Sequence, residues 1–478
     1  MLTYLVLAIF WTALIYATLS RGTLIIYLFF SSFAFGSLAM VPTQLIGGIT
    51  FLPGPFAALG LLVWVLRKRG VSANLLSIAV SPRGMLGLLL FTFAAVASAV
   101  FLPRIFAGQV YIVPVRASDA GLHLLRPSAQ NLTQAAYIII SFLTAIAVFA
   151  AVRLSPRSIY SAMLVGGIVF IATGILDALF GNSSLLDPFR TASYALNTHH
   201  SIGGMERIVG LTPEASSFGT ACMTMAGLLH FLRPGMELSR RQKGLVYCTT
   251  LGLLGMAIAS ASSTAIVMLG VFCLLAVISG FYSFVIKKRA IGRKRVTAGL
   301  VIGAFSTAAA IFIVAFMPEL IGPAFDIFEE LILNKTTSKS FEGRSSWNSS
   351  AWAAFKDTYG LGVGLGGART SSWPIAVLSN TGVFGAAFLT FFLIQIFAFH
   401  RNVSDARLQR AVNGAKLVLL LEFAGLTLSA TQADFGLVSA SVVGIIIAWS
   451  DSLYAATPGR SGKAASARSQ VPVAWANI

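Results

Sequence analysis

Four ionisable residues in or next to two polar segments have side chains suited to chemistry on a phosphorylated substrate. The chain has three long polar segments, 103–134, 180–210 and 318–371. Arg207 lies in the second segment, Glu214 follows it at the start of an apolar run, and Arg344 and Arg369 lie in the third. A guanidinium group binds two phosphate oxygens at once and stays charged at any physiological pH. A carboxylate can take a proton from a hydroxyl group. The alternative is that loop arginines only pair with acids or lipid headgroups.

Glu214 has two interpretations. It follows Thr212 and Pro213 at the start of an apolar run. Threonine as N-cap and proline at the first helical position would make Glu214 an ordinary first-turn acid, which the helix dipole favours. Ionisable residues at membrane depth are, in contrast, candidates for function. The sequence leaves both interpretations open.

The third polar segment also contains aromatic residues and glycines. Trp352, Phe355 and Tyr359, at i, i+3 and i+7, predict one face of an amphipathic helix. Such aromatic residues either anchor a helix at the membrane interface or stack against sugar rings. The run 360–367 contains G-x-G-x-x-G, but no βαβ unit surrounds it, which excludes a dinucleotide site. Its glycines either let backbone amides approach a ligand or allow tight packing.

Membrane helices must position these residues. Hydrophobic residues make up 56% of the 478 residues and charged residues only 10%, whereas a soluble protein has about a quarter charged. We expect an all-α, polytopic transmembrane helical bundle over 1–455, with about 11–13 spans of about 20 residues, and a disordered cytoplasmic tail over 456–478. Glycine and proline interrupt the third span, which is re-entrant in an alternative interpretation. The expected spans are 2–19, 23–41, 45–66, 84–102, 135–152, 158–179, 211–232, 244–260, 264–285, 296–317, 372–398, 414–429 and 435–450.

The basic residues assign the two sides of this bundle. One side would carry 24 of the 34 lysines and arginines, which marks it as cytoplasmic. The loops 103–134, 180–210 and 318–371 then lie outside, and the last is a large extracytoplasmic loop with short amphipathic helices. The net charge of +18 is therefore membrane anchoring, and no nucleic-acid partner is expected. No cysteine or histidine set converges on a metal site, so we expect neither metal nor cofactor.

The order of these motifs resembles the bacterial O-antigen ligase and polysaccharide polymerase superfamily. The resemblance lies in Gly343-Arg344, a tryptophan-rich helix, the glycine run, Arg369-x-Ser371-Ser372, a returning helix near 378–385, and the upstream stretch from Arg207 to Pro213-Glu214-Ala215-Ser216. It implies an inverting, metal-independent membrane glycosyltransferase. The donor would be a glycan on undecaprenyl diphosphate, and the protein would cross the bacterial inner membrane many times, with its active face periplasmic.

The resemblance also implies roles for individual residues. Arg207 and Arg344 would hold the diphosphate. Many ligases have His-Asn where this chain has Ser371-Ser372, so Glu214 becomes the candidate base. Further substrate contacts are expected from Arg369, Arg190, Trp347, Trp352, Ser371 and Ser372.

The two serines favour a polymerase, which would join lipid-linked repeat units into a surface polysaccharide such as O-antigen, capsule or exopolysaccharide. A chain-length regulator and a flippase would be its partners, alongside membrane lipid. One alternative is an O-antigen ligase, which transfers the lipid-linked glycan to an acceptor. A second alternative is a lipid-linked oligosaccharide transporter, but the charges gather in loops rather than along a central path.

Overall fold

The protein is an all-α helical membrane protein with two short β-hairpins. The computed structural model describes residues 2–46, 50–68, 71–115, 121–181, 183–194, 196–197, 201–202, 205–285, 339–399, 403 and 405–450. Its α-helices are α1 (Leu2–Leu19), α2 (Leu24–Ser32), α3 (Pro53–Leu66), α4 (Val71–Val80), α5 (Leu86–Ile105), α6 (Ala129–Leu154), α7 (Pro156–Phe180), α8 (Ala215–Leu232), α9 (Arg240–Ala259), α10 (Ser263–Val285), α13 (Lys339–Asp357), α14 (Trp373–Ile394), α15 (Ala406–Ser429) and α16 (Gly436–Ser450). The hairpins pair β1 (Tyr111–Ile112) with β2 (His123–Leu124) and β3 (Ser201–Ile202) with β4 (Met205–Glu206).

Within the described residues, eight helices are long and apolar enough to cross a membrane: α1, α5, α6, α7, α8, α10, α14 and α15. The helices α3 and α16 are apolar but shorter. These helices confirm the prediction of a multi-pass helical membrane protein. The expected span 296–317, the start of the third loop and the tail 456–478 lie outside the described residues.

The second expected span, 23–41, is wrong in its second half. Helix α2 ends at Ser32. Beyond it, the backbone hydrogen bonds with distant segments, because Ser37 N donates to the carbonyl of Leu211 and Ala39 N donates to Thr191 Oγ1. Apolar composition predicted a helix here, but tertiary hydrogen bonds satisfy the backbone instead.

Small residues allow the central helices to pack closely. A Cβ atom added at Gly444 of α16 would lie 2.5 Å from the carbonyl oxygen of Ala145 in α6. Small residues at such contacts let membrane helices approach each other at the backbone. Helix α15 packs on α16 and on α8, so it connects this central pair to the helices α8, α9 and α10.

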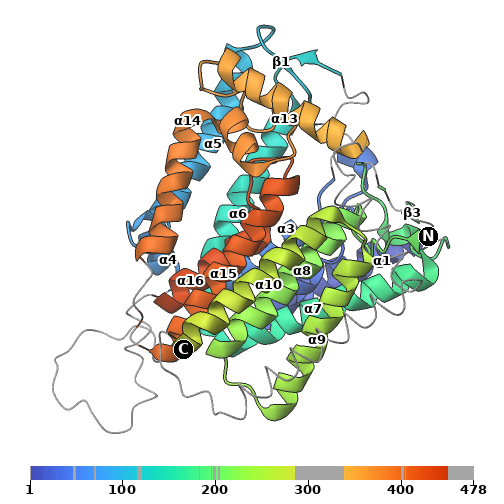
Figure 1. Cartoon of the computed structure of the whole chain (residues 1–478), viewed down its shortest axis with the longest axis vertical. Helices are drawn as coiled ribbons and strands as arrows, with labels where there is room; N and C mark the ends of the chain where they lie inside the picture. Colours follow the sequence, from blue (N-terminus) through green and yellow to red (C-terminus); the bar gives the residue numbers. More distant parts are fainter. Residues whose placement is uncertain are drawn as a thin grey trace, which may run out of the picture.

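All three long polar segments meet at one end of the bundle. There α13 crosses the other helices and packs against α14 and β1 (Figure 1). Arg369 N donates to the carbonyl of Val113 in the first segment at 2.8 Å. Asn131, at the start of α6, donates to the carbonyl of Leu365 at 2.8 Å. These bonds hold the glycine run against the first polar segment.

The glycine run itself is buried between α5, α6 and α14. Gly364 has a φ of +92°, and an added Cβ would lie 2.5 Å from Pro103 Cδ in α5. Gly366 has a φ of +78°, and its Cβ would lie 2.7 Å from the carbonyl oxygen of Gln130. Both positions therefore require glycine, which has no Cβ atom.

We predict that Gly364→Ala lowers the thermal unfolding midpoint of the purified protein by several degrees. The left-handed backbone alone costs an L-residue about 1–2 kcal/mol, and the contact with α5 adds to this. Gly255→Ala is the matched control, because its added Cβ meets nothing within 4 Å on α9 and alanine favours a helix by up to about 1 kcal/mol. Equal midpoints for the two variants would contradict the assigned packing.

Candidate functional site

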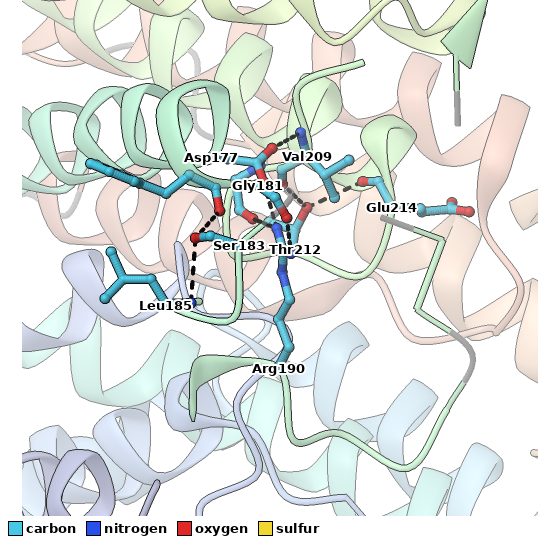
Figure 2. Close-up of polar contacts among 10 residues, drawn as sticks. Asp177, Gly181, Ser183, Leu185, Arg190, Val209, Thr212 and Glu214 are labelled. Atoms are coloured by element: carbon cyan, nitrogen blue, oxygen red, sulfur yellow. Dashed lines mark hydrogen bonds and ion pairs between the residues drawn. The ribbon is translucent and has the colours of Figure 1, made fainter. Parts of the chain in front are cut away.

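A buried carboxylate holds the loop that carries Arg207 and Glu214. Asp177 Oδ2, near the end of α7, accepts hydrogen bonds from Val209 N at 2.7 Å and Gly210 N at 2.9 Å. Its other oxygen accepts a hydrogen bond from Arg190 Nη2 at 2.5 Å, and both side chains of this ion pair are at most 7% exposed. Figure 2 shows this ion pair at the turn of the loop, with the Glu214 side chain pointing away from it. The loop is thus fixed through its own backbone.

Glu214 caps α8 in sequence position, but its side chain does not act as a cap. The helix begins at Ala215, so Glu214 and not Thr212 is the N-cap residue, and the predicted helix start is wrong by two residues. Thr212 Oγ1 instead donates to the carbonyls of Val209 and Glu214. The Glu214 carboxylate makes no cap hydrogen bond and accepts one from the hydroxyl of Ser216. Glu214 is half-buried. Its carboxylate keeps unused acceptor positions.

Arg207 and Arg369, from two separate loops, both lie within electrostatic reach of Glu214 and of Arg344. Burial lowers the pKa of Arg207, while the Glu214 carboxylate opposes this change and the Arg344 charge adds to it. The pKa of Arg369 is lowered by burial in the same way, again opposed by Glu214 and reinforced by Arg344. The fold therefore brings arginines from two loops into one region near Glu214.

Protein contacts orient each of these guanidinium groups without neutralising its charge. Arg207 Nε donates to the carbonyl of Ser260 at 3.1 Å, and Arg344 Nη1 lies 3.5 Å from the carbonyl oxygen of Leu428. The Arg369 guanidinium lies over the Trp347 ring, with its Cζ atom 3.8 Å from the ring centroid. This cation–π contact leaves the edges of the guanidinium free to donate. The arrangement can bind an anion with several oxygens, such as a diphosphate.

Ser371 and Ser372, which follow Arg369 in the chain, lie beside this cluster. Ser371 is buried, and its backbone N donates to Asn348 Oδ1 of α13 at 2.8 Å. Ser372 is the N-cap residue of α14, without a side-chain cap hydrogen bond. Ser371 therefore joins α13 to the start of α14, and Ser372 begins α14.

Two residues that the sequence predicted as substrate contacts, Arg190 and Trp352, lie outside the arginine cluster. Arg190 is committed to Asp177 and to the carbonyl of Gly210, so it supports the loop of Arg207 rather than joining the three arginines. Trp352 stacks on Phe355 with ring centroids 5.2 Å apart. It follows Trp347 by five residues, which places it about 140° further around α13. The predicted three-residue aromatic face is also wrong, because Tyr359 lies beyond the end of α13 with a φ of +53° and is 89% exposed.

Most backbone amides of the segment 360–368 are bonded to protein atoms, so the segment serves mainly packing. Leu365 N donates to Ser98 Oγ, Ala368 N donates to Asn380 Oδ1, and Val363 N donates to the carbonyl of Ser379. Amides that are already bonded to protein atoms cannot bind a ligand. The run contributes to the site by placing Arg369.

A cavity of about 360 Å³ opens beside Glu214. It lies between the first half of α8 and the segment 422–434, which comprises the last turns of α15 and most of the link to α16. Glu422 lies in its wall and accepts hydrogen bonds from the hydroxyls of Thr224 and Ser439. Leu428, whose carbonyl contacts Arg344, immediately precedes the cavity residues Ser429 and Ala430. The arginine cluster and the cavity are therefore neighbours.

The sequence did not assign roles to several residues that build the site. Asp177 was visible as an acid near the end of an apolar run, which is the one signal that could have identified it. Asn348 and Gln432 have ordinary polar side chains in ordinary positions and carried no such signal. Within the described residues, no three His, Cys, Asp or Glu side chains come together as possible metal ligands.

Comparison with known proteins does not assign the chain to a family. No protein-family model matches it, and the search of curated proteins also gave no match.

We predict strong energetic coupling between Asp177 and Arg190. Asp177→Asn and Arg190→Met should each destabilise the protein by about 3–5 kcal/mol, because each leaves a buried charge without its partner. The double variant should be destabilised by clearly less than the sum of the two, as residues in contact are not additive. Unfolding of the four proteins in detergent measures the coupling, and additive effects would show that Arg190 acts elsewhere.

Proposed function

We propose that the protein is a membrane glycosyltransferase that polymerises polyprenyl-diphosphate-linked oligosaccharide repeat units into a surface polysaccharide. The observation that carries this proposal is that Glu214, at the edge of a cavity, lies within electrostatic reach of Arg207 and Arg369, which in turn lie within reach of Arg344. These residues come from two loops that are far apart in the sequence. A cation cluster next to one carboxylate suits a reaction in which a diphosphate leaves and a hydroxyl group is deprotonated.

In this proposal the arginines bind the diphosphate of the donor. Guanidinium groups that are held by carbonyls and by Trp347 keep donors for phosphate oxygens. Their charge counts most in the transition state, because negative charge develops on the leaving oxygen as the glycosidic bond breaks. The ordered surroundings of Arg369 and Arg207 would lower the cost of arranging these donors.

The reaction itself is a single displacement. The oxygen of an acceptor hydroxyl forms a bond to the anomeric carbon of the donor sugar, and the bond from that carbon to the diphosphate oxygen breaks. The electron pair of that bond stays on the diphosphate, where the arginines stabilise it. The hydroxyl proton passes to the Glu214 carboxylate. Attack from the face opposite to the leaving group inverts the anomeric configuration.

The finer topology belongs to the same proposal. The eight candidate spans, together with α9 and the shorter apolar helices α3 and α16, would provide 11 of the 11–13 expected spans. The loop-bearing end would be periplasmic and the membrane would be the bacterial inner membrane. The excess of basic residues on the opposite loops supports this orientation.

We predict that Arg207→Ala, Arg344→Ala and Arg369→Ala each lower the rate of polymerisation about 100-fold or more, the usual effect of losing one donor to developing charge. The cells should accumulate single-repeat glycan while the protein remains inserted in the membrane. Gel profiles of the glycan and blots of the membrane fraction measure both.

Arg104→Ala is the control for these variants. Arg104 lies on the first polar segment, and within the described residues its guanidinium donates to the carbonyl of Val100 alone. Normal chain length in all three cluster variants would refute the proposed site. Long lipid-linked chains that fail to reach their acceptor would identify a ligase, and loss of all external glycan would identify a transporter.

Glu214→Gln tests the base separately. We expect the rate of polymerisation to fall about 100-fold or more, which is the usual contribution of a general base. The glutamine oxygen can still accept the hydrogen bond of Ser216, so the protein should stay inserted. Loss of the carboxylate charge near Arg207 and Arg369 should lower the unfolding midpoint. Near-normal polymerisation by this variant would reduce Glu214 to a positioning residue.

A further inference from the structure

The cavity beside Glu214 extends the candidate site away from the arginines. Its volume of about 360 Å³ is at the lower end of the range for small-molecule pockets. Most of its polar lining consists of uncharged hydroxyl and amide groups rather than cations. The residues with such groups are Ser216, Ser217, Thr220, Thr224, Ser429, Thr431 and Gln432.

Gln432 is the residue in this lining that lacks a partner. Both polar atoms of its side chain, Oε1 and Nε2, are buried and have no hydrogen-bond partner within the part of the chain that the structure describes. A buried amide without partners costs free energy, and such groups in proteins call for an explanation. An amide offers one acceptor and two donor hydrogens. A ligand with adjacent hydroxyl groups, or with an amide of its own, would satisfy it.

The carboxyl groups of the cavity favour one class of ligand further. Glu422 is bonded to two hydroxyls, and Asp434 accepts hydrogen bonds from Ser141 Oγ at 2.9 Å and Gly436 N at 3.2 Å. Within the described residues, neither forms an ion pair with a lysine or arginine. Their remaining lone pairs can accept hydrogen bonds from hydroxyl or amino groups. An anionic ligand would meet the carboxyl groups of Asp434 and Glu214, which both line the cavity.

We propose that this cavity is a subsite for a neutral or amino-substituted sugar ring, and that it discriminates against uronic acids. Gln432 would bind hydroxyl or acetamido groups, while Glu422 and Asp434 would accept hydrogen bonds from them. The ring of Phe33, in the cavity wall, offers an apolar surface to the C–H face of the sugar. The inference rests on the proposed function, since it names the sugar that would react beside Glu214.

Direct binding to the full-length protein in detergent tests this subsite. The probes are methyl glucoside, methyl 2-acetamido-2-deoxyglucoside and methyl glucuronide, measured by saturation-transfer NMR titration. We expect the first two to bind at least tenfold more tightly than the glucuronide. Equal affinity for all three probes, or no binding of any, would overturn the subsite.

Gln432→Met separates a ligand-binding role from a structural role. The variant should lose at least tenfold in affinity for the two neutral probes, while its unfolding midpoint without sugar should stay equal or rise, because the unpartnered amide is removed. Gln109→Met is the control, as Gln109 is exposed and bonds only to the carbonyl of Ile105. Unchanged sugar affinity, or a lowered midpoint, in Gln432→Met would contradict the assignment.

The source of the sugar can be resolved with glucose 1-phosphate. A donor sugar brings its phosphate to the arginines, so this probe should then bind more tightly than methyl glucoside and lose its advantage in Arg207→Ala. Equal binding of the two would indicate the acceptor sugar. If the protein binds sugar but makes no polysaccharide, the proposed function is refuted and the subsite stands. If the protein makes polysaccharide but Gln432→Met binds sugar as tightly as the parent, the proposed function stands and the subsite is refuted.

Discussion

The carboxylate of Asp177 is the contact on which the candidate site depends. Buried at the end of an apolar helix, it would be costly without partners, and two backbone amides and Arg190 provide them. The same contact balances the charge of Arg190. Because any shift of the loop would break three hydrogen bonds in a medium of low polarity, Arg207 and Glu214 are held in place from behind.

The second constraint is the gathering of like charge. Arg344 repels Arg207 and Arg369, and burial adds to the cost of the charges of these two. Carbonyl oxygens, the Trp347 ring and Glu214 offset part of this cost. Within the part of the chain that the structure describes, these contacts leave each guanidinium with further N–H donors. An anion with several oxygens would complete the arrangement, which is the physical basis of the proposed donor site.

The scaffold that places Arg369 depends on backbone rather than on side chains. The glycine run fits between α5, α6 and α14 because Gly364 and Gly366 adopt left-handed conformations and present no Cβ to their neighbours. Helix α14 is kinked where Gly382, with a φ of +67°, meets the same run. The close fit joins segments that are distant in the sequence. The glycine pattern was visible in the sequence, but which of its two possible roles it has depended on what lies around it.

The sequence by itself determined the class of the molecule, because runs of about 20 apolar residues form membrane helices through local hydrogen bonds. It also singled out Arg207, Arg344, Arg369 and Glu214 as candidates, since charged groups stand out in an apolar chain. Only the tertiary structure decided that these candidates come within electrostatic reach of one another and that Arg190 supports a loop. It likewise ended α2 early and revealed the unpaired amide beside the site. The reason is that a helix is a local interaction, whereas the meeting of two loops and the pairing of a buried charge depend on residues far apart in the chain.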